Sequence, residues 1–235
     1  MSAIAAGEIT AGSAPETVLQ WAYATFPRVA IVASFQAESS VLIEMASRIQ
    51  GDEVRVLTLD TGRLPQATHD MIDRVRDRYG IDVQVVVPDA SDVSDMAGRH
   101  GVNLFYKSPE LRRLCCEVRK SRPLARALQG YDAWITGVRR QQAATRADTA
   151  IVAPDREHEG LTKIAPLASW SKDQVWDYIR GHDLPYHPLY ERGYTSIGCE
   201  PCTRATSEGE DERAGRWWWE QGGIKECGLH WSPTR

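Results

Sequence analysis

Short runs of β-branched and other apolar residues alternate along the chain with longer stretches of mixed polarity. The runs are residues 28–34, 53–60, 82–87, 132–137 and 161–165. Most of the stretches between them carry apolar residues at the three- to four-residue spacing of a helix. Strands that alternate with helices in this way usually lie side by side in a parallel sheet. The pattern therefore predicts an α/β fold with helices covering the sheet.

Capping residues mark three helix starts. Two pairs have the spacing of a capping box, namely Ser13 with Glu16 and Ser171 with Gln174. Ser108 followed by Pro109 fits an N-cap with proline at the first helical position. We expect a helix to begin at each of these points.

Polar residues follow the first predicted strand, where the chain enters the next helix. This turn contains Ser34, Gln36 and Ser39. Backbone amides and hydroxyls at the start of a helix favour an anion, and the helix dipole adds to this effect. The turn lacks the glycine and lysine of a Walker loop, so a plain capped helix is an equally good interpretation.

Basic residues follow two further strands. The second strand ends in residues 59–63, from Leu59 to Arg63, and the fourth runs into residues 137–146, from Gly137 to Arg146. Open α/β sheets bind ligands at the carboxyl ends of their strands. A single arginine there is often only a solvated charge, but several at one sheet edge favour an anion site.

The pattern changes near residue 191. Beyond it come a cysteine pair, an acidic run at 208–212 and three consecutive tryptophans, Trp217 to Trp219. We expect an α/β nucleotide-binding domain at residues 1–190 and a C-terminal appendage at 191–235 that folds over the sheet.

Composition narrows the class of protein. The chain is 42% hydrophobic and 26% charged, as in ordinary globular proteins. Its net charge of −4 argues against a nucleic-acid surface. We see neither a signal peptide nor a run of about 18 apolar residues that would span a membrane. The expected location is the cytoplasm, and the sequence leaves open whether the chain forms a homo-oligomer.

The chain has five cysteines, which a reducing cytoplasm would keep out of disulfides. Cys115 and Cys116 are adjacent on a predicted helix with basic neighbours, which would stabilise thiolates. Cys199 and Cys202 have the spacing that lets two sulfurs reach one metal centre. A contiguous pair fits an iron–sulfur cluster better than tetrahedral zinc. Zinc and plain buried thiols remain alternatives.

The fifth cysteine, Cys227, lies near the end of the chain between glycines. A structural cysteine is more often found within a strand or helix core. A mobile segment suits a thiol that must reach two partners, although the position alone leaves its reactivity open.

Taken together, these features resemble the assimilatory adenylyl-sulfate reductases, which are relatives of the phosphoadenylyl-sulfate reductases and of the ATP pyrophosphatases. The matching features are the Ser34 turn, residues 59–63, the Cys115–Cys116 pair with Lys120, residues 137–146, the Cys199 and Cys202 pair, and residues 226–230. The resemblance implies a parallel-sheet, adenine-nucleotide α-hydrolase-like (ATP pyrophosphatase-like) fold with a C-terminal catalytic tail. It also implies the reduction of adenylyl sulfate to sulfite and AMP in sulfate assimilation and cysteine biosynthesis.

The resemblance further implies roles for individual residues. Cys227 would attack the sulfate sulfur, and thioredoxin or a similar dithiol would release sulfite from the resulting S-sulfocysteine. The other four cysteines, Cys115, Cys116, Cys199 and Cys202, would hold a 4Fe-4S cluster that does not itself deliver the electrons. The cations that offset charge repulsion during the attack would be Lys120, Arg146, Arg213 and Arg216. The nucleotide would be held by Ser34, Gln36, Ser39, Leu59, Arg63 and Gly137. His230 would orient or activate the thiol, or is an ordinary surface histidine.

Three rival interpretations stay open. The chain could prefer the 3'-phosphorylated substrate of the phosphoadenylyl-sulfate reductases. It could be an adenylating ATP pyrophosphatase, although residues 34–40 lack the Ser-Gly-Gly-x-Asp-Ser loop of those enzymes. It could also be a zinc-stabilised nucleotide-binding module, which would leave Cys227 without a purpose.

Overall fold

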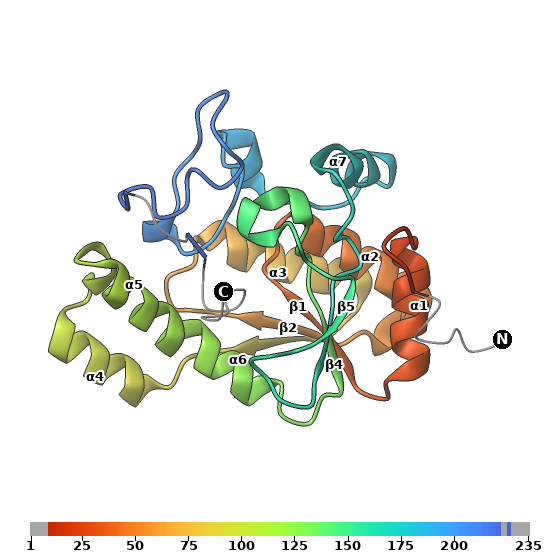
Figure 1. Ribbon diagram of the computed structural model, residues 1–235, viewed down its shortest axis with the longest axis horizontal. Helices are drawn as coiled ribbons and strands as arrows, with labels where there is room; N and C mark the ends of the chain where they lie inside the picture. Colours follow the sequence, from red (N-terminus) through yellow and green to blue (C-terminus); the bar gives the residue numbers. More distant parts are fainter. Residues whose placement is uncertain (1–8, 222–224, 227–235) are drawn as a thin grey trace.

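A computed structural model describes residues 9–221 and 225–226 of the chain (Figure 1). Its centre is a six-stranded sheet with the strand order β3-β2-β1-β4-β6-β5. The strands are β1 (Val29–Ala33), β2 (Val56–Leu59), β3 (Val83–Val86), β4 (Ala133–Ile135), β5 (Val152–Pro154) and β6 (Thr162–Ile164). All neighbouring strands are parallel except β5, which pairs antiparallel with β6. The predicted α/β class and the five predicted strands are confirmed.

The edge strand β5 has no counterpart in the sequence pattern. It is only three residues long and ends in a proline, which is tolerated at a sheet edge because one side needs no hydrogen bonds. A proline in a short apolar run argues against a strand, which is why the sequence pattern did not indicate β5.

Helices cover both faces of the sheet. They are α1 (Pro15–Thr25), α2 (Ala37–Gln50), α3 (Gln66–Tyr79), α4 (Ala90–His100), α5 (Pro109–Cys116), α6 (Arg122–Ala127) and α7 (Lys172–Gly181). One face, which includes Ile31, packs against α1, α2, α3 and α7, and the other, which includes Ala30 and Trp134, packs against α6 (Figure 1). Adjacent residues of β1 thus point into different cores, as the two-residue period of a strand requires. No helix within the described residues is both long and apolar enough to cross a bilayer.

A helix begins at or within two residues of each predicted start, and two of the three predicted caps are confirmed. Ser171 Oγ accepts a bond from the Gln174 amide at 3.1 Å, and Gln174 Oε1 accepts one from the Ser171 amide at 2.8 Å. Ser108 Oγ accepts a bond from the Leu111 amide at 3.2 Å at the start of α5. Both caps satisfy amides that lack a partner within the helix.

The capping box predicted at Ser13 and Glu16 is wrong. Helix α1 begins at Pro15, and its N-cap is Ala14, which makes no side-chain cap. Ser13 Oγ instead accepts a bond from the Thr10 amide at 2.9 Å in the preceding turn. The hydroxyl is therefore already used one turn before the helix.

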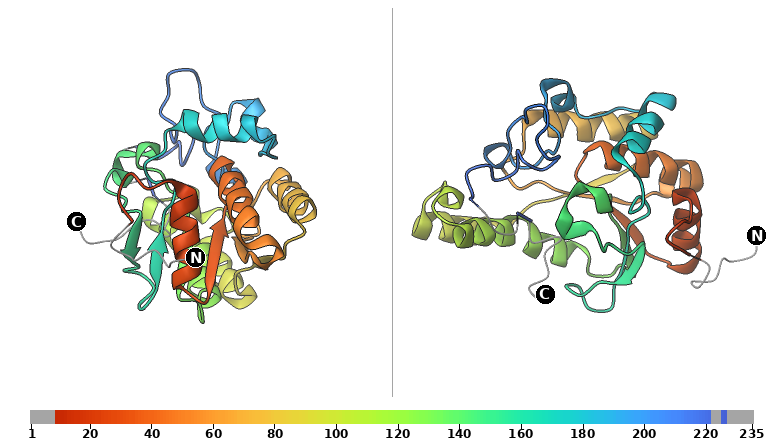
Figure 2. Two further views of the ribbon diagram at one scale, coloured as in Figure 1. Left: turned by 90° about the vertical axis from the view of Figure 1, so that its right-hand side faces the viewer. Right: turned by 45° about the horizontal axis from the view of Figure 1, so that its top comes forward.

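The order of the strands reverses between β1 and β4, since β2 and β3 lie on one side of β1 while β4 lies on the other. Such a reversal leaves a crevice at the carboxyl ends of the strands. The appendage from residue 191 packs on this end: the Ile197 amide donates to Gln36 Oε1 at 2.7 Å, and the Glu200 amide donates to the Arg63 carbonyl at 2.8 Å. Figure 2 shows this blue segment at the same end of the molecule as α7. The division between residues 190 and 191 stays a prediction.

Candidate active site

A pocket opens at the carboxyl ends of β1, β2 and β4, at the reversal of strand order. The predicted site residues that line it are Ser34, Gln36, Ser39, Leu59, Lys120, Gly137, Arg146, Arg213 and Arg216. These residues come from three strand-end loops, from the segment after α5 and from the appendage. The structure thus brings together most of the residues that the sequence singled out.

The Ser34 turn forms one wall of the pocket. Ser39 Oγ accepts a bond from the Ser34 amide at 3.1 Å, and Gln36 Nε2 donates to Ser34 Oγ at 3.1 Å. Between them Phe35 is buried and has a φ of 55°, which is rare for a bulky residue. Backbone strain of this kind is found mostly at functional sites, where the surrounding structure enforces it. The turn is therefore more than a plain capped helix.

A buried ion-pair network supports this wall from behind. Arg139 Nε donates to Glu38 Oε1 at 2.7 Å, and Arg139 Nη2 donates to Glu212 at 2.9 Å. Gln142 Nε2 donates to Glu38 Oε1 at 2.8 Å. Gly137 is required here because a Cβ on it would come within 2.7 Å of the Glu38 Cβ. The network joins α2, the loop after β4 and the appendage.

Arg63 is not among the described residues that line this pocket. Its Nη2 donates to the Val102 carbonyl at 2.8 Å and its Nη1 donates to Asn103 at 3.2 Å, while the guanidinium lies over the Phe105 ring. Arg63 thus ties the loop after β2 to the segment before α5, and its predicted contact with a nucleotide stays a prediction.

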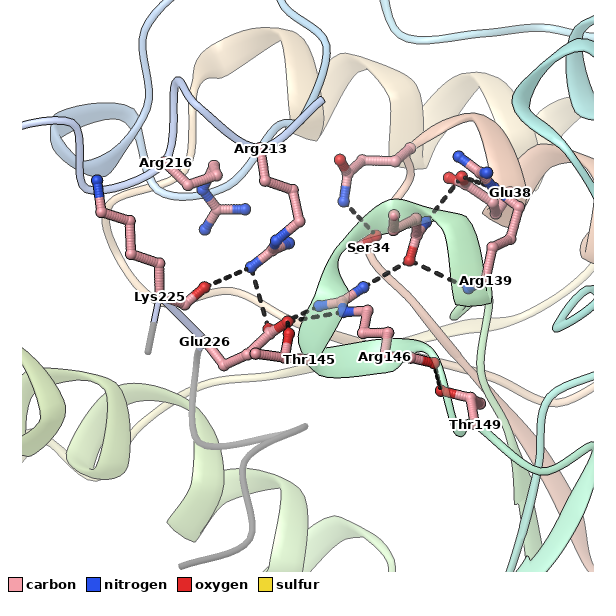
Figure 3. A network of polar contacts seen from close by, with 12 residues as sticks. Ser34, Glu38, Arg139, Thr145, Arg146, Thr149, Arg213, Arg216, Lys225 and Glu226 are labelled. Carbon is pink, nitrogen blue, oxygen red and sulfur yellow. Dashed lines mark hydrogen bonds and ion pairs between the residues drawn. The ribbon is translucent and has the colours of Figure 1, made fainter. Parts of the chain in front are cut away.

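Glu226 binds two of the predicted cations (Figure 3). Arg146 donates from Nε to Oε1 and from Nη2 to Oε2, both at 2.8 Å. Arg213 Nη2 donates to Oε2 at 3.0 Å, and Thr145 Oγ1 donates to Oε1 at 2.8 Å. Arg146 Nη1 also donates to Gln142 Oε1 at 2.5 Å, which connects this group to the Arg139 network.

The Glu226 side chain is 1% exposed. Burial would raise the pKa of its carboxyl, but hydrogen bonding from Arg146 and the charges of Arg213 and Arg146 lower that pKa below its usual range. Glu226 is therefore ionised at neutral pH.

The four cysteines outside the tail meet in one buried cluster. Cys115 and Cys116 lie at the end of α5, while Cys199 precedes a short 3-10 turn of the appendage and Cys202 is its last residue. All four are at most 9% exposed, and none forms a disulfide. The spacing of the two pairs therefore reflects one site built from segments far apart in the sequence.

The pKa values of these thiols respond to burial and to nearby cations. Burial raises the pKa of the Cys115 thiol, and it raises that of Cys202 to about 12 with the help of the neighbouring Cys199 and Cys116. Burial opposes ionisation of Cys199 as well, but Lys120, a hydrogen bond from Thr61 and the charge of Arg216 lower its pKa. Of Cys115, Cys199 and Cys202, only Cys199 therefore has surroundings that favour the thiolate.

Lys120 lies between the cysteine cluster and the pocket. It lines the pocket wall and hydrogen bonds to Cys199. The sequence predicted a continuous α-helix here, whereas residues Glu117–Ser121 form a π-helical turn between α5 and α6. The ring of Pro123 would clash with the carbonyl of Arg119 in a regular α-helix, which is consistent with a break in the α-helical pattern here. Such π turns are frequent at functional sites.

Trp217 connects the appendage to the cluster. Its ring is 1% exposed and has the guanidinium groups of Arg112, Arg213 and Arg216 within 4.5, 5.9 and 4.8 Å of its centroid. Its amide donates to the Cys202 carbonyl at 3.1 Å. Cation–π contacts therefore fix three arginines around one ring. The sequence suggested core or lid packing for the tryptophan run but gave no account of three in succession.

Residues 28–205 match the family model described as the phosphoadenosine phosphosulfate reductase domain. The chain belongs to this family. The reductase-domain match includes the Ser34 turn and all four clustered cysteines, and it confirms the resemblance predicted from the sequence. It ends before Arg213, Arg216 and the tail.

Individual relatives of this reductase-domain chain agree with the family. The adenosine 5'-phosphosulfate reductase of Burkholderia cepacia is 48% identical over 198 residues, which cover 84% of this chain and 79% of that protein. The crystal structure of a phosphoadenylyl-sulfate reductase from Candida auris, a phosphate complex, has a TM-score of 0.69 at 28% identity and covers 81% of this chain and 90% of its own.

A more distant structure shares the fold alone. The NH3-dependent NAD synthetase of Campylobacter jejuni has a TM-score of 0.52 at 11% identity and covers 78% of this chain and 75% of its own. Together with the reductase structure, it confirms the predicted adenine-nucleotide α-hydrolase-like fold.

Sequence reasoning missed several polar and charged residues of this site. Glu38, Arg139 and Gln142 form the network behind the Ser34 turn, and Glu226 binds Arg146. The one signal available was position: Glu38 lies within the Ser34 turn, directly before Ser39, and Glu226 directly precedes Cys227. Cys227 and His230 themselves lie outside the described residues, so their roles stay predictions.

Proposed function

We propose that this chain reduces adenylyl sulfate to sulfite and AMP in sulfate assimilation, in the cytoplasm. The observation that carries the proposal is the pocket, in which a strained nucleotide-type turn faces the cations Lys120, Arg146, Arg213 and Arg216. Clustered guanidinium and ammonium groups suit a substrate that carries phosphate and sulfate. The names of relatives at 48% identity support the same substrate.

In the first step the Cys227 thiolate attacks the sulfate sulfur of adenylyl sulfate. A sulfur–sulfur bond forms, the bond from sulfur to the bridging oxygen breaks, and its electron pair leaves with AMP. Thiolate and substrate are both anionic, so cations that line the pocket lower the barrier by offsetting their repulsion. The product on the enzyme is S-sulfocysteine.

In the second step a dithiol such as thioredoxin attacks the sulfur of Cys227. The sulfur–sulfur bond breaks, and sulfite leaves with its electron pair. The second thiol of the dithiol then resolves the mixed disulfide and returns Cys227 to its reduced form. The dithiol supplies both electrons and ends as a disulfide.

We further propose that Cys115, Cys116, Cys199 and Cys202 bind one 4Fe-4S cluster. Four buried thiols without a disulfide, next to Lys120 and Arg216, fit a group that requires four thiolates. In the described part of the chain no three His, Cys, Asp or Glu side chains form a site for one metal ion. A 4Fe-4S cluster is larger than a single metal ion, so four thiols that do not converge on one ion could still hold it. When bound, the cluster would supply structural support and a local charge beside Lys120.

Replacing Lys120 with methionine should slow S-sulfonation at least tenfold, which corresponds to about 1.4 kcal/mol in the barrier. The ammonium group lies between Cys199 and the pocket, and methionine keeps the stem but removes the charge. Single-turnover formation of the Cys227 adduct is the measurement, with iron content checked in parallel. Lys172→Met, on an exposed lysine at the start of α7, is the matched control. If the adduct formed at the wild-type rate in Lys120→Met, the lysine would be only a solvated charge on the helix surface, with no role in the reaction.

Adenylyl sulfate with a dithiol should yield AMP and sulfite in equal amounts. The related Candida auris structure is a phosphoadenylyl-sulfate reductase, so the 3'-phosphorylated nucleotide is the second candidate. Competition between the two nucleotides, scored as the ratio of their kcat/KM values, distinguishes them. We expect adenylyl sulfate to be preferred. A preference for the 3'-phosphorylated form would reassign the substrate, and nucleotide turnover without sulfite would reject reduction altogether.

A further inference from the structure

Glu226 is held from two sides. Its carboxylate is bound by Arg146 and Arg213 and by the hydroxyl of Thr145 (Figure 3). Its backbone carbonyl accepts a bond from Arg112 Nη1 at 2.8 Å. Both the side chain and the main chain of this one residue are thereby fixed at the pocket. Cys227 follows this residue directly in the sequence.

The strength of this attachment exceeds that of a surface ion pair. The contact with Arg146 is bidentate, which gives orientation as well as energy. The Glu226 side chain is 1% exposed and the Arg146 side chain 9%, so solvent screens the pair little. Breaking a buried pair from one side leaves an uncompensated charge, which is strongly unfavourable. The tail is therefore anchored at Glu226.

The anchor is also connected to the cysteine cluster. Arg112, which bonds the Glu226 carbonyl, forms an ion pair with Glu220 at 2.8 Å and stacks on Trp217. Arg112 also hydrogen bonds to Cys116. One arginine thus links a cysteine of the cluster to the residue that precedes the tail thiol.

We propose that Glu226 is a positioning residue, whose clamp by Arg146, Arg213, Thr145 and Arg112 holds Cys227 over the pocket for attack on the substrate. This inference rests on the proposed function, in which Cys227 is the nucleophile. Reactions between held groups are sensitive to placement, and a shift of about 1 Å can cost roughly a hundredfold in rate. Lys120 and Arg216 line the same pocket. They add positive charge near the substrate besides that of the two arginines that bind Glu226.

In an alternative role, the Glu226 carboxylate is a stand-in for an anionic group of the substrate. It would occupy Arg146 and Arg213 until adenylyl sulfate binds and displaces it. The two roles differ in which constant they change. Loss of a positioning residue lowers the rate at saturating substrate and leaves affinity nearly unchanged. Loss of a stand-in removes a competitor for Arg146 and Arg213, so the substrate binds more tightly and the saturating rate is unchanged.

The test compares Glu226→Ala and Glu226→Gln with Glu208→Ala, an exposed glutamate in the appendage that serves as the matched control. Glutamine keeps the shape and one hydrogen-bond acceptor if the alanine variant folds poorly. We expect the single-turnover rate of Cys227 S-sulfonation at saturating adenylyl sulfate to fall roughly tenfold or more in Glu226→Ala, and less in Glu226→Gln. The dissociation constant of the nucleotide should change less than about threefold.

A second measurement needs no substrate. Alkylation of Cys227 by iodoacetamide, followed by mass spectrometry of its peptide, should be faster in Glu226→Ala than in the wild type and in Glu208→Ala. Unchanged alkylation together with an unchanged saturating rate would overturn the inference, and so would tighter substrate binding at an unchanged rate. A wild-type protein that forms no adduct on Cys227 would instead overturn the proposed function itself.

Discussion

Replacing Cys227 with serine should reduce S-sulfonation and sulfite release by at least roughly 1000-fold, or about 4 kcal/mol in the barrier. Serine is barely ionised near neutral pH and lacks the nucleophilicity of a thiolate, so no covalent intermediate forms. The pocket lining, including Lys120 and Arg146, is untouched by this change, so the variant should bind adenylyl sulfate with wild-type affinity.

The measurement combines sulfite release with nucleotide binding and iron content. The variant should keep its iron, because the four clustered cysteines are other residues. Loss of nucleotide binding would mean that the change disturbs the pocket. Sulfite production faster than roughly one thousandth of the wild-type rate would require a second nucleophile.

Replacing Cys202 with serine should remove the iron, the brown colour and the activity together. Cys202 is 7% exposed and lies among Cys116 and Cys199, where burial raises its pKa to about 12 without a metal. A thiolate there requires a bound cation, whereas a serine hydroxyl is a poor ligand for iron. The amide of Trp217 bonds the Cys202 carbonyl, so loss of the cluster should also loosen the arginines around that ring.

Iron and sulfide analysis of anaerobically purified protein is the readout for this variant. Cys227→Ser is the matched control, since it makes the same thiol-to-hydroxyl change in the tail and should leave iron unchanged. A fully active Cys202→Ser protein without iron would refute the cluster, and zinc in the wild-type protein would favour the zinc alternative.

Local sequence patterns predicted helices and strands well where a few neighbouring residues decide the structure. The strand at Val29–Ala33 is apolar on both faces because helices cover both sides of it, and its five residues show this directly. The Ser171 cap needs only Gln174, three residues away. Ser13 has the same pattern and fails, because its hydroxyl bonds back to Thr10, and a spacing rule cannot show that competition.

The site was predictable in its residue types and not in its pairings. Strand-end arginines and paired cysteines were visible in the sequence, but the Arg139–Glu38 pair spans 101 residues and the Arg146–Glu226 pair spans 80. Residues so far apart in the sequence become partners only when the chain folds, so no local pattern predicts them. Arg63 shows the same limit: its position at a strand end suggested a nucleotide contact, which stays a prediction, while its bonds to Val102 and Asn103 could not be seen in the sequence.

Mass spectrometry of the wild-type protein mixed with adenylyl sulfate, without reductant, tests the central claim most directly. The account predicts one added sulfonate per chain, on the peptide that contains Cys227, with AMP released in equal amount and sulfite appearing only after a dithiol is added. An adduct on a different cysteine, or sulfite formed steadily by Cys227→Ser, would contradict it.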